Sequence, residues 1–315
     1  MTILTRLTKK DFEKILKNYS IGRYRSHKHL PWALMNTVYG LKTTKGKFIL
    51  KIFEKANSEF IKNQIQIIDF LYKKKIPVAR ISKLENGKEL LIYNKKKIII
   101  QKFIKGKAKK NYNVSTLKNV AKKFGKMSKN LLKLKILDRS EWEKNHQFDL
   151  IKKFSKNKTF DLKNEAKLLL KELNKLDKKK LRKSFIHGDF HGVNLLIQNN
   201  KLKAIIDFDD AHKDYLAYEI AVFIIDPLIR EKSFDKKLAR IFFKEYQNQL
   251  KIKKEEKKAI YLFIKHRLLG IIINCQKQIE IHPDKKKHLL KDIIRFSLKY
   301  KIFNKISLEE FLKLT

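Results

Sequence analysis

The stretch FIHGDFHGVNLLIQNNKLKAIIDFD, residues 185–209, carries the pattern that decides the fold. It contains two short apolar runs, Leu195–Gln198 and Lys203–Ile206, separated by the polar segment Asn199–Leu202. Two such runs around a polar turn are typical of an antiparallel β-hairpin. We therefore predict a hairpin whose turn is centred near Asn200-Lys201.

An amide and a carboxylate are expected to meet at the open end of this hairpin. The predicted register places Asn194 opposite Asp207, and side chains that face each other across two strands lie roughly 5 Å apart. Two oxygen ligands of this kind suit Mg²⁺, which takes its remaining ligands from water and phosphate. We therefore predict Asn194 and Asp207 as magnesium ligands.

A second carboxylate, Asp189, lies on the loop that enters the hairpin. There it can orient a substrate hydroxyl and accept its proton while a phosphoryl group arrives. Protein kinases place an Asp five residues before an Asn and follow them with a metal-binding Asp-Phe-Gly. Here Asp189 and Asn194 keep that spacing, and Asp207–Asp209 stands where Asp-Phe-Gly would. Each element alone is commonplace and could be structural, but their order and spacing favour a kinase.

At these residues the sequence resembles the superfamily of aminoglycoside phosphotransferases and choline kinases. The matching residues are His187, Gly188, Asp189 and Asn194, followed by Ile206, Asp207 and Phe208. The resemblance implies a two-lobed, protein-kinase-like α+β fold with ATP in the cleft between the lobes. It also implies Asp189 as catalytic base, Asn194 and Asp207 as ligands of Mg²⁺, and His187 as a structural residue of the loop.

Within that superfamily the chain is most similar to the homoserine kinases of the same fold. The similar segments are Asn36–Tyr39, Gly46–Lys51, Ile76–Arg80, Phe103–Gly106 and Leu216–Ala221. The sequence departs from the pattern in several places, two of which concern the loops of the site. Leu30–Met35 would have to replace a glycine-rich loop over the phosphates, and Glu219 replaces the usual Asp. We expect Glu219 to brace the catalytic loop rather than to take part in the chemistry.

The pattern along the chain predicts a small mixed N-terminal lobe, residues 1–103, and a larger, mainly helical lobe, residues 104–315. In the first lobe we expect a helix capped by Thr8, strands at 36–43, 47–53, 90–93 and 97–103, and a helix from Ser58. In the second lobe we expect helices at 117–134 and 161–176, the hairpin, and several helices from about Leu216 to Phe311.

Three residues of the first lobe are predicted to bind the nucleotide. Lys51, at the end of an apolar strand, would hold the α- and β-phosphates as a point charge. Gln101 and Phe103 belong to a connector whose backbone groups would contact adenine. The acidic partner of Lys51 stays open, because the following helix offers Gln64 and Gln66, with Glu59 a turn earlier.

The chain is strongly basic, with a formal net charge of +44 over 315 residues. Such a field attracts polyanions, but the lysines are scattered, so we do not favour nucleic acid as a partner. The single cysteine, Cys275, excludes an intramolecular disulfide. The N-terminus has no long apolar stretch, and the most apolar later segment, Ala259–Cys275, is interrupted by charges. We therefore expect a cytoplasmic protein without a membrane partner.

The acceptor is the least determined part of the prediction. The C-terminal lobe offers few acidic residues among many lysines, which argues against polycationic aminoglycosides and for a small zwitterion such as homoserine. Another small-alcohol, antibiotic or protein kinase on the same scaffold is the first alternative. A non-catalytic protein that binds nucleic acid through its basic surface is the second. The acceptor, the choice between ATP and GTP, and the oligomeric state stay open.

Overall fold

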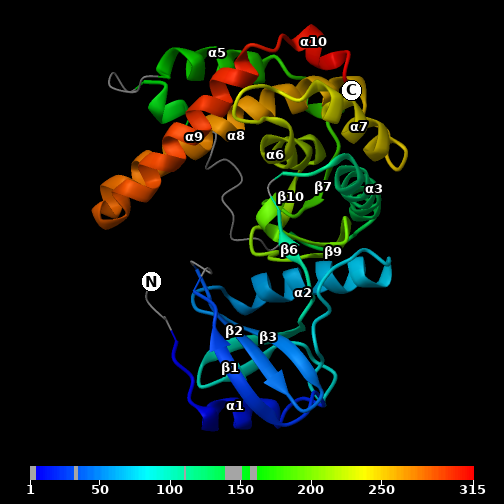
Figure 1. The fold of residues 1–315 in the computed structure, drawn as a ribbon, viewed down its shortest axis with the longest axis vertical. Helices are drawn as coiled ribbons and strands as arrows, with labels where there is room; N and C mark the ends of the chain where they lie inside the picture. The colour runs from blue at the N-terminus through cyan, green and yellow to red at the C-terminus, as the bar shows by residue number, and fades with distance from the viewer. Residues whose placement is uncertain (1–4, 32–34, 110, 139–150, 157–161) are drawn as a thin grey trace.

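The computed structural model describes residues 5–31, 35–109, 111–138, 151–156 and 162–315. Figure 1 shows two lobes joined near β6 (Lys107–Ala108), a sheet with two helices below and a mainly helical body above. The two-lobed, protein-kinase-like α+β fold is thus confirmed. The division between residues 103 and 104 stays a prediction, and part of the expected phosphate loop, residues 32–34, lies outside the described residues.

The N-terminal lobe is built on a five-stranded antiparallel sheet. In spatial order its strands are β1 (Tyr24–His29), β2 (Thr37–Thr43), β3 (Gly46–Phe53), β5 (Lys96–Lys102) and β4 (Leu91–Tyr93). The predicted strands are present, whereas β1 was not expected. Its sequence YRSHKH lies at the edge of the sheet and is mostly exposed, so it lacks the apolar alternation by which strands are recognised.

Two helices cover the opposite faces of this sheet. Helix α1 (Lys9–Leu16) begins with a capping box between Thr8 and Asp11, and α2 (Ser58–Lys73) begins with an Asn57 cap. Leu50 and Ile52 of β3 belong to the hydrophobic cluster that includes residues of α1. Side chains alternate along a strand, so Lys51 between them points to the opposite face, toward the C-terminal lobe.

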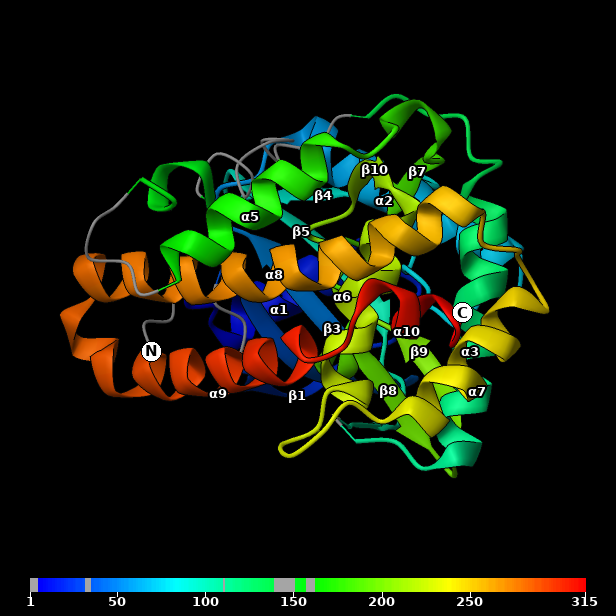
Figure 2. The same ribbon diagram turned by 90° about the horizontal axis from the view of Figure 1, so that it is seen from above.

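The C-terminal lobe is organised around one central helix. Its described helices are α3 (Val114–Leu131), α5 (Lys163–Asn174), α6 (Leu216–Leu228), α7 (Lys236–Gln247), α8 (Lys254–Ile281), α9 (Lys286–Asn304) and α10 (Leu308–Leu312). Almost every residue of α6 is buried, as expected for a helix that is apolar on all sides. Seen from above, α8 and α9 run side by side past α6 (Figure 2). None of the described helices is long and apolar enough to cross a membrane.

The predicted hairpin forms, but its register differs from the prediction by one residue. Strands β8 (Leu195–Gln198) and β9 (Lys201–Ile205) flank a two-residue turn, Asn199-Asn200, whose residues both have positive φ. Asparagine tolerates that conformation, which a type I′ turn requires. The turn lies one residue earlier than predicted, which by itself would displace the pairing by two positions, and an irregularity after Leu196 recovers one of them. The N–H of Ile206, not of Asp207, therefore faces Asn194 and donates to its carbonyl at 3.0 Å.

Candidate active site

Lys51 crosses from the sheet to the C-terminal lobe and ends between two carboxylates. Its Nζ lies 3.1 Å from Asp207 Oδ1 and forms a second, shorter ion pair with Asp209 Oδ1. Burial alone would lower the pKa of Lys51, but the charges of Asp209 and Asp207 raise that pKa above its ordinary value. A cation buried to this degree needs such partners. Both ion-pair partners that Lys51 has among the described residues thus come from the loop after β9 and not from α2.

The pKa values of the two carboxylates shift in opposite directions. The nearby ammonium of Lys51 lowers the pKa of Asp207 below its ordinary value. Burial raises the pKa of Asp209, and the neighbouring charge of Asp207 adds to that rise. Asp209 also accepts a 2.6 Å hydrogen bond from Asn36 Nδ2, so it joins two residues of the N-terminal lobe to the loop after β9.

The loop before Asp189 is held by buried contacts on both sides. The fully buried His187 places Nε2 2.8 Å from the carbonyl oxygen of Ile206 and accepts the N–H of Asp189 on Nδ1. Burial lowers the pKa of His187, which keeps the imidazole neutral. The backbone N–H of His187 donates to Glu219 Oε2, and Glu219 is itself buried on α6. These contacts join the loop to β9 and α6.

Gly188 is required by the close approach of another loop. Its φ is +80°, and a Cβ at this position would lie 2.2 Å from the carbonyl oxygen of Asp210. No side chain fits that space, and L residues rarely adopt that φ. The residue therefore brings the segment around Asp189 against the segment around Asp210.

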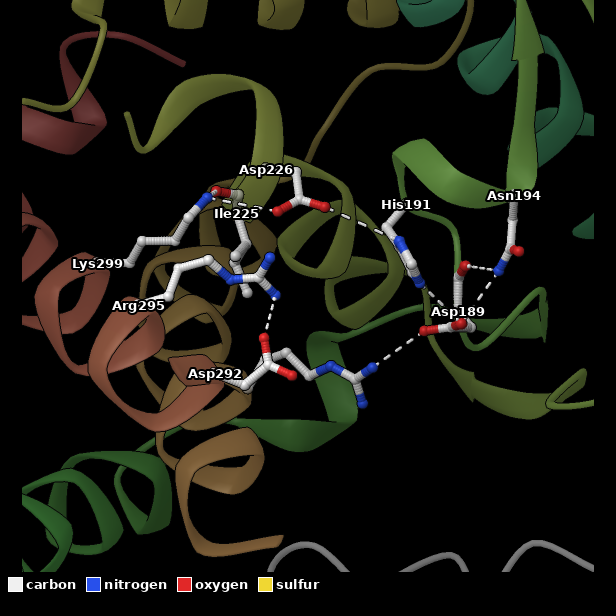
Figure 3. Close-up of polar contacts among 9 residues, drawn as sticks. Asp189, His191, Asn194, Ile225, Asp226, Asp292, Arg295 and Lys299 are labelled. Carbon is white, nitrogen blue, oxygen red and sulfur yellow. Dashed lines mark hydrogen bonds and ion pairs between the residues drawn. The ribbon is translucent and has the colours of Figure 1, made fainter. Parts of the chain in front are cut away.

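Asp189 is surrounded by donors on both carboxylate oxygens (Figure 3). Oδ2 lies 2.9 Å from His191 Nε2 and accepts a 3.0 Å hydrogen bond from Asn194 Nδ2. Oδ1 lies 3.1 Å from a guanidinium nitrogen of Arg267, a residue of α8. Burial opposes ionisation of this group, but His191 and Arg267 outweigh it and hold the pKa of Asp189 below its ordinary value. Asp189 is therefore a charged hydrogen-bond acceptor near neutral pH.

The donor set around Asn194 and Asp207 suits a magnesium ion. The amide nitrogen of Asn194 donates to the carbonyl and the carboxylate of Asp189, which leaves its Oδ1 directed away from Asp189 (Figure 3). Asp207 is about half exposed and offers carboxylate oxygens. No cluster of three or more His, Cys, Asp or Glu that could hold a metal occurs in the described part of the chain. An ion here would take its other ligands from phosphate and water, as Mg²⁺ does.

A row of charges continues from Asp189 into the helical lobe. His191 Nδ1 lies 3.8 Å from Asp226 on α6, and Asp226 lies 3.4 Å from Lys299 Nζ on α9. Lys299 also donates to the carbonyl of Ile225 at 2.6 Å. Figure 3 shows these groups together with Arg295 of α9. Charged side chains of both signs therefore lie close to Asp189.

Gln101 and Phe103, the residues predicted to contact adenine, lie at the end of β5 and directly after it, in the N-terminal lobe. Gln101 directs its side chain to the carbonyl oxygen of Ala79 at 3.2 Å. The backbone N–H of Phe103 donates to the carbonyl of Lys47 at 3.1 Å, and the Phe103 side chain is exposed. That N–H is thus engaged within the fold, so a contact from Phe103 to a nucleotide would use its carbonyl group or its ring.

Three residues at the site were missed by reasoning from the sequence. The sequence does not predict Asp209 as the partner of Lys51. Asn36 was noticed only as part of a strand. Arg267 was noticed only as a charge that interrupts an apolar segment. A charged residue within a mostly apolar helix needs a partner when it is buried, so the position of Arg267 in the apolar segment Ala259–Cys275 could have marked it as a site residue.

A sequence model of the family described as "Phosphotransferase enzyme family" matches residues 28–252. The chain belongs to this family. The match includes every predicted site residue, from Lys51 to Glu219. The phosphotransferase is a small-molecule kinase by family, and the resemblance inferred from the His-Gly-Asp segment is confirmed.

Curated relatives of the phosphotransferase carry the name homoserine kinase. That of Zymomonas mobilis is 24% identical over 287 residues, which cover 87% of this chain and 88% of the relative. That of Rhodopseudomonas palustris strain BisA53 is 24% identical over 281 residues, with coverages of 87% and 85%. The similarity thus extends over both lobes.

Solved structures with the same fold act on varied small molecules, as their names state. An amicoumacin kinase in complex with AMP-PNP, Ca²⁺ and its ligand has a TM-score of 0.73 at 18% identity, covering 98% of both chains. A microcompartment-associated aminopropanol kinase has a TM-score of 0.70 at 13% identity, covering 96% of this chain and 98% of the other. At these identities the likeness establishes the fold.

Proposed function

We propose that the phosphotransferase moves the γ-phosphoryl group of ATP to the hydroxyl of homoserine or a similar amino-acid-like acceptor. The observation that carries the proposal is the grouping of Asp189, Asn194 and Asp207 at adjoining loop ends, with Lys51 reaching them from the other lobe. This is the set of groups that phosphoryl transfer needs for positioning and charge neutralisation.

Asp189 orients the acceptor in this proposal. The hydroxyl donates to the carboxylate, and its oxygen attacks the γ-phosphorus as the bond from that phosphorus to the bridging oxygen of ADP breaks. The proton passes to Asp189 and from there to solvent. The donors on Asp189 keep it ionised, so it acts first as a fixed acceptor that aligns the oxygen and takes the proton late. His187 and Glu219 hold the loop in place.

The remaining predicted residues hold the nucleotide. Lys51 contacts its phosphates while keeping its carboxylate partners, and Gln101 and Phe103 flank the adenine. Asn194 and Asp207 would hold Mg²⁺, which neutralises charge on the β- and γ-phosphates when bound. The amicoumacin kinase with AMP-PNP and Ca²⁺ supports the use of a nucleotide and a divalent ion by this fold.

The preference for an amino-acid-like acceptor rests on the names of the curated relatives and on the mixed charges beside Asp189. Asp210, whose pKa burial and the charge of Asp189 raise to about 6, and Asp226 are the nearby carboxylates that suit an ammonium group. Arg267 is a nearby cation that suits a carboxylate group.

A coupled ADP-release assay over amino acids, aminoalcohols, sugars, choline and aminoglycosides tests the proposal. We expect homoserine or a close analogue to give the highest kcat/KM, and Asp189→Asn to lower kcat about 1,000-fold while nucleotide binding persists. A different acceptor with higher kcat/KM would replace the acceptor alone. If no alcohol is phosphorylated although the protein is folded and binds ATP, the enzymatic proposal is wrong.

A further inference from the structure

Arg267, Arg295 and Lys299 are cations near Asp189, and the ion-pair partner of Arg267 distinguishes it from the other two. Lys299 is neutralised by Asp226, and Arg295 lies 3.1 Å from Asp292. Arg267 instead lies 3.1 Å from Oδ1 of Asp189, the carboxylate that faces the acceptor. Its side chain is only 16% exposed. A buried guanidinium thus stands at the reacting centre rather than at the surface.

The position of Arg267 restricts what the rest of the acceptor can be. A hydroxyl that donates to Asp189 places the next few atoms of a small molecule within a few ångströms of the guanidinium. A guanidinium has five N–H donors in a planar fork, and that of Arg267 meets Asp189 Oδ1 and also hydrogen-bonds with the Tyr218 side chain. The fork matches a carboxylate, whereas an ammonium at the same distance is repelled.

We propose that Arg267 is the specificity-determining residue for the acceptor, selecting small alcohols that carry a carboxylate a few bonds from the reacting hydroxyl. The inference rests on the proposed phosphoryl-transfer function. In the free protein Asp189 compensates the charge of Arg267, and in the complex the acceptor carboxylate shares that guanidinium.

A panel of four-carbon alcohols separates the effect of the carboxylate from that of size. Homoserine and 4-hydroxybutyrate carry a carboxylate, whereas 4-amino-1-butanol and 1,4-butanediol do not. We expect the wild-type protein to favour the two acids by about 100-fold in kcat/KM, the scale of one well-formed, buried charge pair. Equal kcat/KM values for the four alcohols would overturn the inference. This measurement uses the wild-type protein alone, so it does not depend on whether a variant folds.

Arg267→Gln removes the charge and keeps most of the side-chain length. We expect it to reduce the preference for acids about 100-fold, and Arg267→Lys to restore part of it, because lysine keeps the charge without the fork. Arg240→Gln, the same change at an exposed position of α7, should leave the preference unchanged. An equal loss for all four alcohols would assign Arg267 to the positioning of Asp189 alone and would contradict the inference.

Calorimetry separates this inference from the proposed function. With AMP-PNP present, 4-hydroxybutyrate should bind the wild-type protein and should bind Arg267→Gln at least tenfold more weakly. If 4-hydroxybutyrate binds through Arg267 but no alcohol is phosphorylated, the carboxylate site stands and the kinase proposal fails. If alcohols are phosphorylated with no dependence on Arg267, the kinase proposal stands and the specificity role is wrong.

Discussion

Glu219 offers a test of how the catalytic loop is held. The residue is 1% exposed, and its Oε2 accepts the backbone N–H of His187. Burial raises the pKa of Glu219 from 4.5 to about 8, although that N–H and the charge of His212 act in the opposite direction. At neutral pH the folded protein therefore keeps Glu219 protonated. Glu219→Gln preserves the shape and the acceptor oxygen but cannot titrate.

The sign of the effect follows from proton binding. Below about pH 4.5 Glu219 is protonated in both states, so its contribution to stability is complete. Between about pH 4.5 and 8 the unfolded chain releases the proton and the folded chain keeps it. The free energy of unfolding then falls by about 1.4 kcal/mol per pH unit. Over the whole range from about pH 4.5 to 8 the free energy of unfolding of the wild type falls by up to about 5 kcal/mol through this group. Glu219→Gln does not show this decrease, because glutamine does not titrate.

Urea unfolding of both proteins at about pH 5.5 and 7.5 measures the difference. We expect Glu219→Gln to gain about 3 kcal/mol relative to wild type between these two pH values, at unchanged m-values. Asp210 titrates in both proteins, so its contribution largely cancels in the comparison. A pH-independent difference, or a wild type that gains stability over the variant with rising pH, would refute the reasoning. The carboxylate would then be ionised in the folded protein.

Two further substitutions test the ion pairs that Lys51 forms with Asp207 and Asp209. Asp207→Asn keeps the side-chain shape but removes the charge, so the magnesium concentration for half-maximal activity should rise at least tenfold; an unchanged magnesium titration would remove Asp207 from the metal site. Asp209→Asn leaves Lys51 with one charged partner, so the free energy of unfolding without nucleotide should fall by about 2 kcal/mol. ATP should restore part of that loss by supplying phosphate charge to Lys51, and a loss unaffected by ATP would place Lys51 outside the nucleotide site.

The sequence determines the local parts of the site because short-range geometry controls them. The spacing of Asp189 and Asn194 predicts their proximity, since one loop and one short helical turn join them. The run Asn199-Asn200 permits the tight turn that folds β9 back onto β8. The apolar pattern of β3 likewise predicts that Lys51 projects from a buried strand.

Tertiary packing alone decided the partners that come from far along the chain. The turn at Asn199-Asn200 and the irregularity after Leu196 together displaced the hairpin pairing by one residue at its open end, which no alternation of residue types could reveal. Asp209 meets Lys51 across 158 sequence positions, because the two lobes pack together there. Arg267 meets Asp189 across 78 positions, because α8 lies beside the loop that carries Asp189. Such contacts depend on how whole elements dock, and hydrophobic burial directs that docking without specifying which charges will meet.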